Sequence, residues 1–338
     1  MTDFKGKKLF IGLLFTGLVV LGLVLIGPAG NSLAADKPMV LKLGHVLSPT
    51  HNWNVAAVGF AKDVEKETQG RIKINVFPSG QLGNEEEMIR SLMLHTMDMG
   101  LIGGDSFESI EPKMVIEALP YAWDDHDHAY RALDGELGQR LLALLLKKGV
   151  RGLAYLENGF RHVTNSVRPI TKPEDLKGIK LRTPQTPMKT KTFQALGASP
   201  VPMGFTEVYP ALKQKVVDGQ ENPLAIIYNY KIYEVNEYLS LTGHIWSSAI
   251  LVIDEQVWKK IDKKDQDIMT KLAVKWRGKQ RQMIKDSEAD LLAKIKKTQM
   301  KVNTVDKGPF REAVEPVWKE YEKVFGRDLM DLIDKYRK

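Results

Sequence analysis

Short apolar segments alternate with longer amphipathic ones in the first third of the chain. Apolar residues at every second position predict strands at Val40–His45 and Ile72–Val76, and a short apolar run predicts a third over Met97–Ile102. Helical spacing over Asn52–Thr68, and in the segment that Asn84 is expected to cap, separates these strands. Because strands that alternate with helices usually pair in parallel, the pattern predicts a parallel α/β unit.

A second series of short apolar segments fills the middle of the chain, after a helix expected over Asp127–Lys148. Strands are predicted at Arg151–Tyr155, Phe160–Thr164, Ile179–Arg182 and Ser199–Pro202, and helices at Met188–Leu196 and Glu207–Gln214. A strand over Ala249–Asp254 is expected to cross back, and the chain is helical from Gln256 onward. The sequence therefore predicts two α/β lobes, with a cleft between them suited to a ligand.

The division into lobes follows from these elements. We expect residues 35–155 and roughly 245–280 to form lobe I, and residues 156–244 to form lobe II. Residues 281–338 are expected to form C-terminal helices that pack on the lobes.

The first 34 residues have the pattern of a secretory signal. Three lysines between positions 5 and 8 precede an apolar run over Leu9–Ile26, and Ser32-Leu33-Ala34 offers small residues before a cleavage point. The apolar run is also near the length of a membrane-spanning helix, so an uncleaved anchor stays open as an alternative. We expect residues 1–34 to be a signal peptide and the mature protein to be periplasmic.

Composition narrows the classes of function. The 338 residues are 43% hydrophobic and 27% charged, as in ordinary globular proteins. The formal net charge of +7 comes without a basic run interleaved with aromatic residues, which gives nucleic-acid binding little support. The chain has no cysteine, which excludes disulfides, thiolate chemistry and a lipid-modified N-terminal cysteine.

Two arginines are candidates for binding an anion. Arg182 ends the strand expected over Ile179–Arg182, and ligands of open α/β sheets lie beyond the carboxyl ends of strands. A guanidinium matches a carboxylate through two parallel hydrogen bonds. Arg161 lies in a similar strand-like context. From position alone, an ordinary structural role remains open for both.

Other polar segments are ambiguous. Val217–Pro223 reads as a polar turn, yet Asn222 before proline is held in extended geometry that aims its amide away from a helix. His126 and His128 lie among aspartates but follow no known metal-ligand spacing, and the acids are better explained as a helix start. Neither a phosphate-binding loop nor a nucleophile elbow occurs. We expect no metal and no cofactor.

Six short motifs, taken together and in order, carry a family resemblance. They are Phe77-Pro78-Ser79-Gly80-Gln81-Leu82-Gly83, Ala118-Leu119-Pro120-Tyr121, Gly178-Ile179-Lys180-Leu181-Arg182, Gly197-Ala198-Ser199-Pro200, Phe205-Thr206-Glu207-Val208-Tyr209-Pro210-Ala211-Leu212 and Val217-Asp218-Gly219-Gln220-Glu221-Asn222-Pro223. Over about Val40–Asp328 the chain resembles the substrate-binding proteins of TRAP transporters, the DctP-like family.

The resemblance implies a fold and a set of site residues. The fold is a two-lobed periplasmic binding protein, or venus-flytrap, with hinge strands and a long connecting helix. Arg182 matches the arginine that binds the ligand carboxylate, Arg161 and Asn222 match residues that assist it, and Phe205 matches an aromatic that packs on the ligand. The stretch Asn158–Ser166 looks more like members that bind sugar acids or small dicarboxylates, in which His45, Asp105 and Gln185 would contact ligand hydroxyls.

The resemblance also implies what the protein does. It would be a monomeric receptor without enzymatic activity that delivers a small organic acid to the membrane permease of a TRAP transporter. A sugar acid such as a hexuronate is the expected ligand, and a C4-dicarboxylate is the alternative within the family. Two other classes stay open: a sugar-acid lyase, for which His45 is the only reasonable base, and a scaffold or adhesin held by an uncleaved anchor.

Overall fold

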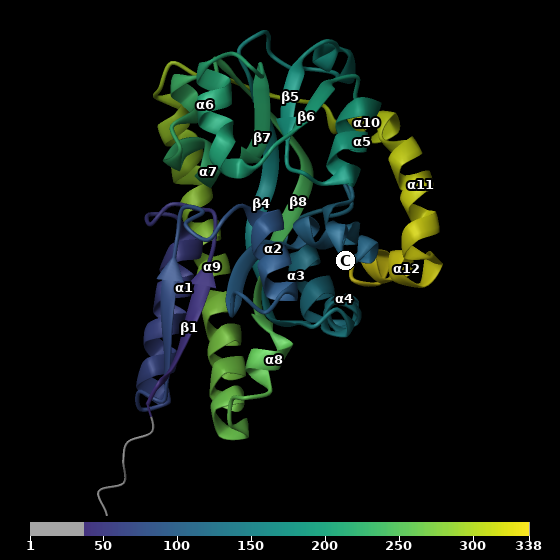
Figure 1. Ribbon diagram of the computed structural model, residues 1–338. Coiled ribbons are helices and arrows are strands. Elements are labelled where there is room, and N and C mark those ends of the chain that lie inside the picture. Colours follow the sequence, from purple (N-terminus) through teal and green to yellow (C-terminus); the bar gives the residue numbers. More distant parts are fainter. Residues whose placement is uncertain (1–36, 338) are drawn as a thin grey trace, which may run out of the picture. The chain divides into compact units, whose positions relative to one another are not determined.

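The computed structural model describes residues 37–337 (Figure 1). The predicted signal peptide, residues 1–34, lies outside the described residues. Strands lie at β1 (Met39–Gly44), β2 (Ile72–Phe77), β3 (Met99–Gly103), β4 (Val150–Asn165), β5 (Lys180–Thr183), β6 (Ser199–Pro202), β7 (Gly219–Pro223), β8 (Tyr238–Asp254) and β9 (Lys301–Thr304).

Helices separate most of these strands. The α-helices are α1 (Asn52–Glu67), α2 (Glu85–Met93), α3 (His126–Asp134), α4 (Glu136–Lys147), α5 (Pro187–Ala195), α6 (Val208–Lys213), α7 (Leu224–Asn229), α8 (Glu255–Trp258), α9 (Lys263–Lys296), α10 (Lys307–Ala313), α11 (Glu315–Phe325) and α12 (Arg327–Lys335). Short 3₁₀ helices are η1 (Gly104–Ser109), η2 (Pro112–Ala118), η3 (Pro173–Leu176), η4 (Phe205–Glu207) and η5 (Ile232–Glu234).

The strands of the described chain form one mixed sheet in the order β2-β1-β3-β8-β4-β7-β5-β6, with β9 paired to β8. Strands β1, β2 and β3, with α1 to α4, make up lobe I, and strands β5, β6 and β7, with α5 to α7, make up lobe II. Figure 1 shows β4 and β8 running from one lobe into the other. The carboxyl ends of β1 and β3 therefore meet those of β5 and β7 between the lobes, which is where ligands of open α/β sheets bind.

Local signals explain where the site-forming helices begin. The Asn84 side chain accepts from the Glu87 backbone N–H and the Glu87 carboxylate accepts from that of Asn84, a reciprocal cap that starts α2 as predicted. His51 caps α1 through its ring nitrogen, which accepts from the backbone N–H of Trp53. Both caps fix the first turn of a helix that contributes a side chain to the cavity between the lobes.

The hinge strand β4 was expected as two strands, and this prediction was wrong. Residues 150–165 form one strand that pairs with β8 across register shifts, including one between Glu157 and Gly159. Gly159 has φ of +120°, a conformation that side-chain-bearing residues rarely adopt, and it lets the strand continue through the irregularity. Glu157, Asn158 and Gly159 interrupt the alternation of apolar residues. The sequence therefore predicts the end of a strand at a position where the strand continues.

Three further elements differ from expectation. Residues 219–223 form the buried strand β7 rather than a turn, because their polar side chains face the ligand cavity and its supporting network instead of water. The helix expected over Asp127–Lys148 is divided at Gly135, where an added Cβ would lie 2.4 Å from the Tyr336 hydroxyl oxygen. Strand β9 interrupts the segment expected to be helical throughout.

The hydrophobic core consists of separate apolar clusters, which follow the division of the strands between the two lobes. The largest apolar cluster joins the β1–β3 region to the apolar faces of α11 and α12, including Tyr321 and Leu332. A second cluster in lobe II includes Phe193 and Phe310, and a third includes Leu212 and Ile295. The C-terminal helices therefore contribute to both lobes, and the residue numbers proposed for the lobe boundaries remain a prediction.

Candidate functional site

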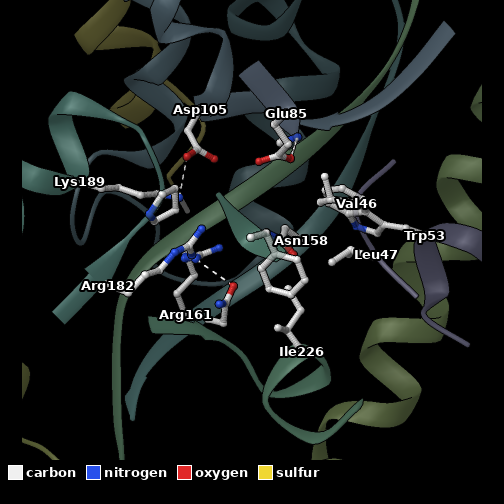
Figure 2. A pocket seen from close by; sticks show the side chains of 14 residues that line it. Val46, Leu47, Trp53, Glu85, Asp105, Asn158, Arg161, Arg182, Lys189 and Ile226 are labelled. Atoms are coloured by element: carbon white, nitrogen blue, oxygen red, sulfur yellow. Dashed lines mark hydrogen bonds and ion pairs between the residues drawn. The ribbon is translucent and has the colours of Figure 1, made fainter. Parts of the chain in front are cut away.

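A cavity lies between the lobes where the parallel strands end (Figure 2). Lobe I contributes Val46, Leu47, Trp53, Glu85, Gly103 and Asp105, lobe II contributes Arg182, Pro184, Lys189, Phe205, Asn222 and Ile226, and the hinge strand β4 contributes Asn158 and Arg161. Five of the seven site residues expected from the sequence thus line one cavity: Arg182, Arg161, Asn222, Phe205 and Asp105.

Arg182 lies on β5 with its side chain almost completely buried. Its Nε and Nη2 donate to the carbonyl oxygen of Met203 at 3.1 and 2.7 Å. Burial lowers the pKa of Arg182 to about 10, so the guanidinium remains protonated at neutral pH. Within residues 37–337 Arg182 forms no ion pair, and the carboxylates of Glu221, Glu85 and Asp105 act on it only from beyond ion-pair distance.

Arg161, in contrast, is neutralised. Its Nη2 donates to the Glu221 carboxylate at 2.7 Å and to the Asn222 side-chain oxygen at 3.0 Å, and its Nε also donates to Glu221. Burial opposes the ionisation of Glu221, but the adjacent Arg161, together with His244 and Lys189, outweighs burial and holds the pKa of Glu221 well below its usual value. His244 contributes a further hydrogen bond to Glu221 at 3.1 Å. This network fixes the amide of Asn222 in the cavity wall.

Asp105 and Lys189 form a second neutral pair on the cavity wall. The Lys189 Nζ lies 2.6 Å from the Asp105 carboxylate, and the hydroxyl of Thr186 donates to the same carboxylate oxygen at 3.1 Å. Burial raises the pKa of Asp105, but the charges of Lys189 and Arg161 and the hydrogen bonds from Lys189 and Thr186 together outweigh burial, and the pKa is lowered. Lys189 was not expected from the sequence, because a lysine within an amphipathic helix usually lies on the solvent face.

Glu85 adds an acidic group to the cavity. It is the first residue of α2, and its carboxylate accepts from the backbone N–H of Gly103 at 2.8 Å and from the Ser106 hydroxyl at 2.9 Å. Burial and the nearby Asp105 raise the pKa of Glu85. The sequence signal for Glu85 was indistinguishable from that of acids that stabilise the positive end of a helix dipole.

The remaining walls are aromatic and amide groups. Trp53 is held by a hydrogen bond of 2.9 Å from its indole N–H to the carbonyl oxygen of Glu157, and Phe205 packs edge-on against Tyr230 at 4.7 Å between ring centroids. The side-chain oxygen of Asn158 is buried at the cavity and has no hydrogen-bond partner among the described residues. It is therefore an acceptor available to a ligand.

Two of the expected site residues lie elsewhere. The His45 ring is buried beneath the cavity loop, where Nδ1 accepts from the backbone N–H of Leu47 and Nε2 contacts Asn54 at 3.2 Å. Burial lowers the pKa of His45 to about 4. Gln185 lines a neighbouring cavity and donates to Glu86. His45 thus shapes the loop that carries Val46 and Leu47.

The aspartates near His126 start a helix, as predicted. Asp125 caps α3 by accepting from the backbone N–H of His128 at 2.7 Å. His126 contacts the carboxylates of Glu157 at 2.6 Å and Glu288 at 3.2 Å, which join the hinge strand to α9. In the described part of the chain, no group of three or more acidic or histidine side chains is placed to hold a metal ion.

Residues 43–324 match the family model described as bacterial extracellular solute-binding protein, family 7. The chain belongs to this family. It is 35% identical over 285 residues to the 2,3-diketo-L-gulonate-binding periplasmic protein of Escherichia coli K12, a match that covers 84% of this chain and 86% of that protein.

Solved structures of TRAP periplasmic solute-binding proteins share the two-lobed fold. One from Polaromonas sp. JS666 with bound D-erythronate superposes with a TM-score of 0.86 at 38% identity, over 89% of this chain and 99% of that one. Another from Sulfurospirillum deleyianum with bound succinate gives a TM-score of 0.84 at 32% identity, over 88% and 99% of the two chains.

This chain is therefore a TRAP-type solute-binding protein with the predicted venus-flytrap fold. It is a receptor rather than an enzyme. Proteins of this family are extracellular or periplasmic. Among the residues that the structure describes, the receptor has no helix with both the length and the apolar character needed to cross a bilayer.

Proposed function

We propose that the receptor captures a hydroxylated monocarboxylate, a sugar acid such as a hexuronate, and holds its carboxylate at Arg182. Arg161 and Asn222 position the carboxylate end of the site, and Phe205 packs on the ligand. A planar guanidinium forms two parallel hydrogen bonds to a carboxylate, which gives both affinity and orientation.

The pairing of charged side chains on the cavity wall is the observation that supports this proposal. Arg161 is paired with Glu221 and Lys189 with Asp105, so Arg182 is the one cation of the described cavity wall that lacks a carboxylate partner. A closed cavity excludes water and makes an uncompensated charge costly. One ligand carboxylate would form the ion pair that Arg182 lacks, since Glu85 faces the same cavity but is bonded to Gly103 and Ser106.

The remaining cavity groups favour hydroxyls over a second carboxylate. Glu85, Asp105 and the unpartnered oxygen of Asn158 are all acceptors, and a hydroxyl can donate to them. A dicarboxylate has no such donor when both groups are ionised, and its second charge would face the carboxylates of Glu85 and Asp105. The ligands of two relatives, 2,3-diketo-L-gulonate and D-erythronate, are monocarboxylates with hydroxyl groups, whereas the succinate-bound relative supports the C4-dicarboxylate alternative.

The remaining parts of the proposal follow from the family. Residues 1–34 would direct export of the receptor, which would bind its ligand outside the cytoplasmic membrane. The closed receptor would then deliver the ligand to the permease of a TRAP transporter. Closure would turn the lobes about β4 and β8, the strands that connect them.

A thermal-shift panel tests the ligand class. D-galacturonate, D-glucuronate, D-galactonate, D-erythronate and succinate are compared at equal concentration with the purified receptor. A ligand at 100 times its dissociation constant stabilises by about 2.7 kcal/mol, which is readily seen as a rise in melting temperature. We expect the largest shift from a hydroxylated monocarboxylate. A largest shift from succinate would replace the sugar acid with the dicarboxylate alternative.

A further inference from the structure

The Asp105–Lys189 pair joins opposite lobes across the ligand cavity. Asp105 lies in η1, directly after β3 of lobe I, and Lys189 lies on α5 of lobe II. Figure 2 shows the two side chains joined at the cavity, on the same side as Arg182. Gln185 and Glu86 form another contact between the lobes beside it. Opening about the hinge strands would separate Asp105 from Lys189, so the pair belongs to the closed cleft.

Burial limits how much the Asp105–Lys189 ion pair can stabilise the closed cleft. The side chains of Lys189 and Asp105 are 1% and 5% exposed. Both groups must lose their hydration when the cleft closes, and the attraction within a buried ion pair does little more than offset that loss. The pair therefore cannot by itself hold the lobes together. A role in selecting the ligand fits a costly charged pair better than a role in stability.

The hydrogen-bonding capacity of the pair is only partly used. The Lys189 ammonium has three N–H donors, and among the described residues Asp105 is its only partner within bonding distance. The contacts to Lys189 and Thr186 both use Oδ2 of Asp105, while Oδ1 forms no hydrogen bond within residues 37–337. An unused donor and an unused acceptor thus lie side by side on the cavity wall. A hydroxyl group, which donates and accepts at once, satisfies both.

We propose that Lys189 is a specificity-determining residue, which with Asp105 binds a ligand hydroxyl close to the carboxylate and couples that hydroxyl to closure of the cleft. This inference rests on the proposed function, because it assumes that the ligand carboxylate lies at Arg182. An acid without the hydroxyl leaves polar groups of the closed cleft unsatisfied, and sites built around a hydroxyl reject such analogues strongly.

The test compares two acids that differ only in the hydroxyl next to the carboxylate. D-erythronate and 2-deoxy-D-erythronate are titrated by calorimetry into the full mature receptor and into its Lys189→Met variant. We expect the wild type to prefer D-erythronate by about 10- to 100-fold and Lys189→Met to reduce this preference to less than about threefold. The control is Lys191→Met, because Lys191 lies on the same helix but pairs with Glu320 at the surface. It should keep the wild-type preference.

A second variant addresses the charge left on Asp105 by Lys189→Met. The double substitution Asp105→Leu and Lys189→Met replaces the pair with apolar groups and leaves no unpaired charge, and circular dichroism verifies its fold. It should also bind the two acids equally.

Two results would overturn the inference. One is an equal loss of affinity for both acids in the variants, which assigns the pair a purely structural role. The other is a wild type that binds both acids equally. Failure of the proposed function is distinct, because it appears in the ligand panel as a preference for succinate or as a loss of all binding to hydroxylated monocarboxylates.

Discussion

Arg161 and Arg182 line the same cavity, yet only Arg161 is paired with a carboxylate. Glu221 neutralises Arg161 within a buried network, whereas the one acceptor of Arg182 among the described residues is the neutral carbonyl of Met203. Two buried arginines next to each other repel, and Arg161 contributes to lowering the pKa of Arg182, after the larger effect of burial. The arrangement leaves the Arg182 guanidinium without an ion-pair partner among the described residues, so it can pair with an anionic group of the ligand.

Glu85 is expected to exclude dicarboxylates. Glu85→Gln keeps the shape of the side chain and its contacts to Gly103 and Ser106 but removes a negative charge from the cavity. We predict that the variant binds succinate about tenfold more tightly than wild type, a change of about 1.4 kcal/mol, as measured by calorimetry. Glu67→Gln, an exposed position on α1, serves as the control. An unchanged or weaker affinity for succinate contradicts the role given to Glu85.

Mild acid is expected to destabilise the receptor through buried imidazoles. Burial lowers the pKa of His45 to about 4, and that of His51 and His162 to about 3, compared with about 6.5 in the unfolded chain. Because the unfolded state binds protons first, stability falls as the pH decreases from about 6.5, by up to about 1.4 kcal/mol per pH unit for each imidazole.

Chemical denaturation between pH 6.5 and 5 measures this slope. His126 acts in the opposite direction near pH 6.5, because contacts with Glu157 and Glu288 outweigh burial and raise its folded-state pKa to about 10, while its unfolded ring is only about half protonated there. This opposing contribution becomes small at pH 5, where both states are protonated. The variant His51→Asn keeps an N-cap acceptor for α1 and removes one titrating ring, so its stability should depend less on pH. A slope equal to that of wild type would show that His51 does not bind a proton on unfolding.

Closure of the lobes is expected on ligand binding. Small-angle scattering of the mature protein, with and without the acid that gives the largest thermal shift, should show a smaller radius of gyration in the complex. The hinge strands β4 and β8 connect the lobes and permit this rotation. An unchanged radius at verified saturation argues against closure.

Export is expected to remove the first 34 residues. Small residues around Ser32-Leu33-Ala34 provide the cleavage site, so the mature protein should begin at Ala35 or Asp36. N-terminal sequencing of the protein from its native host determines the first residue. Recovery of the full-length chain in the membrane fraction would instead indicate an uncleaved anchor.

The sequence was most informative where a residue type has one dominant chemical reason to be present. The caps at Asn84 and Asp125, the strand that carries Arg182 and the family of the chain were all predictable. The sequence pattern of Val217–Pro223 predicts a turn because the segment is polar. Its polar side chains are buried by pairing with β4, which carries Arg161 and is distant in sequence, so the local pattern does not show that the segment is a strand.

Residues whose role depends on the partner lobe could not be recognised in advance. Lys189 resembles any surface lysine of a helix, and Glu85 resembles any acid of a first helical turn, until the other lobe closes over them. Asn158 lies in an irregularity of a strand that local patterns divided in two. Such contacts depend on the relative position of the lobes, which short-range periodicity does not encode.

The most direct measurement of the central claim is the affinity of Arg182 variants for the wild-type ligand. Removing one member of a desolvated charge pair costs on the order of 2–5 kcal/mol, so Arg182→Ala should weaken binding by roughly 30- to several-thousand-fold by calorimetry. Arg182→Lys keeps the charge without the planar fork and should recover part of the loss. Arg140→Ala, at an exposed ion pair on α4, should bind as wild type. If Arg182→Ala folds normally by circular dichroism and binds within about threefold of wild type, Arg182 is structural and the proposed site is wrong.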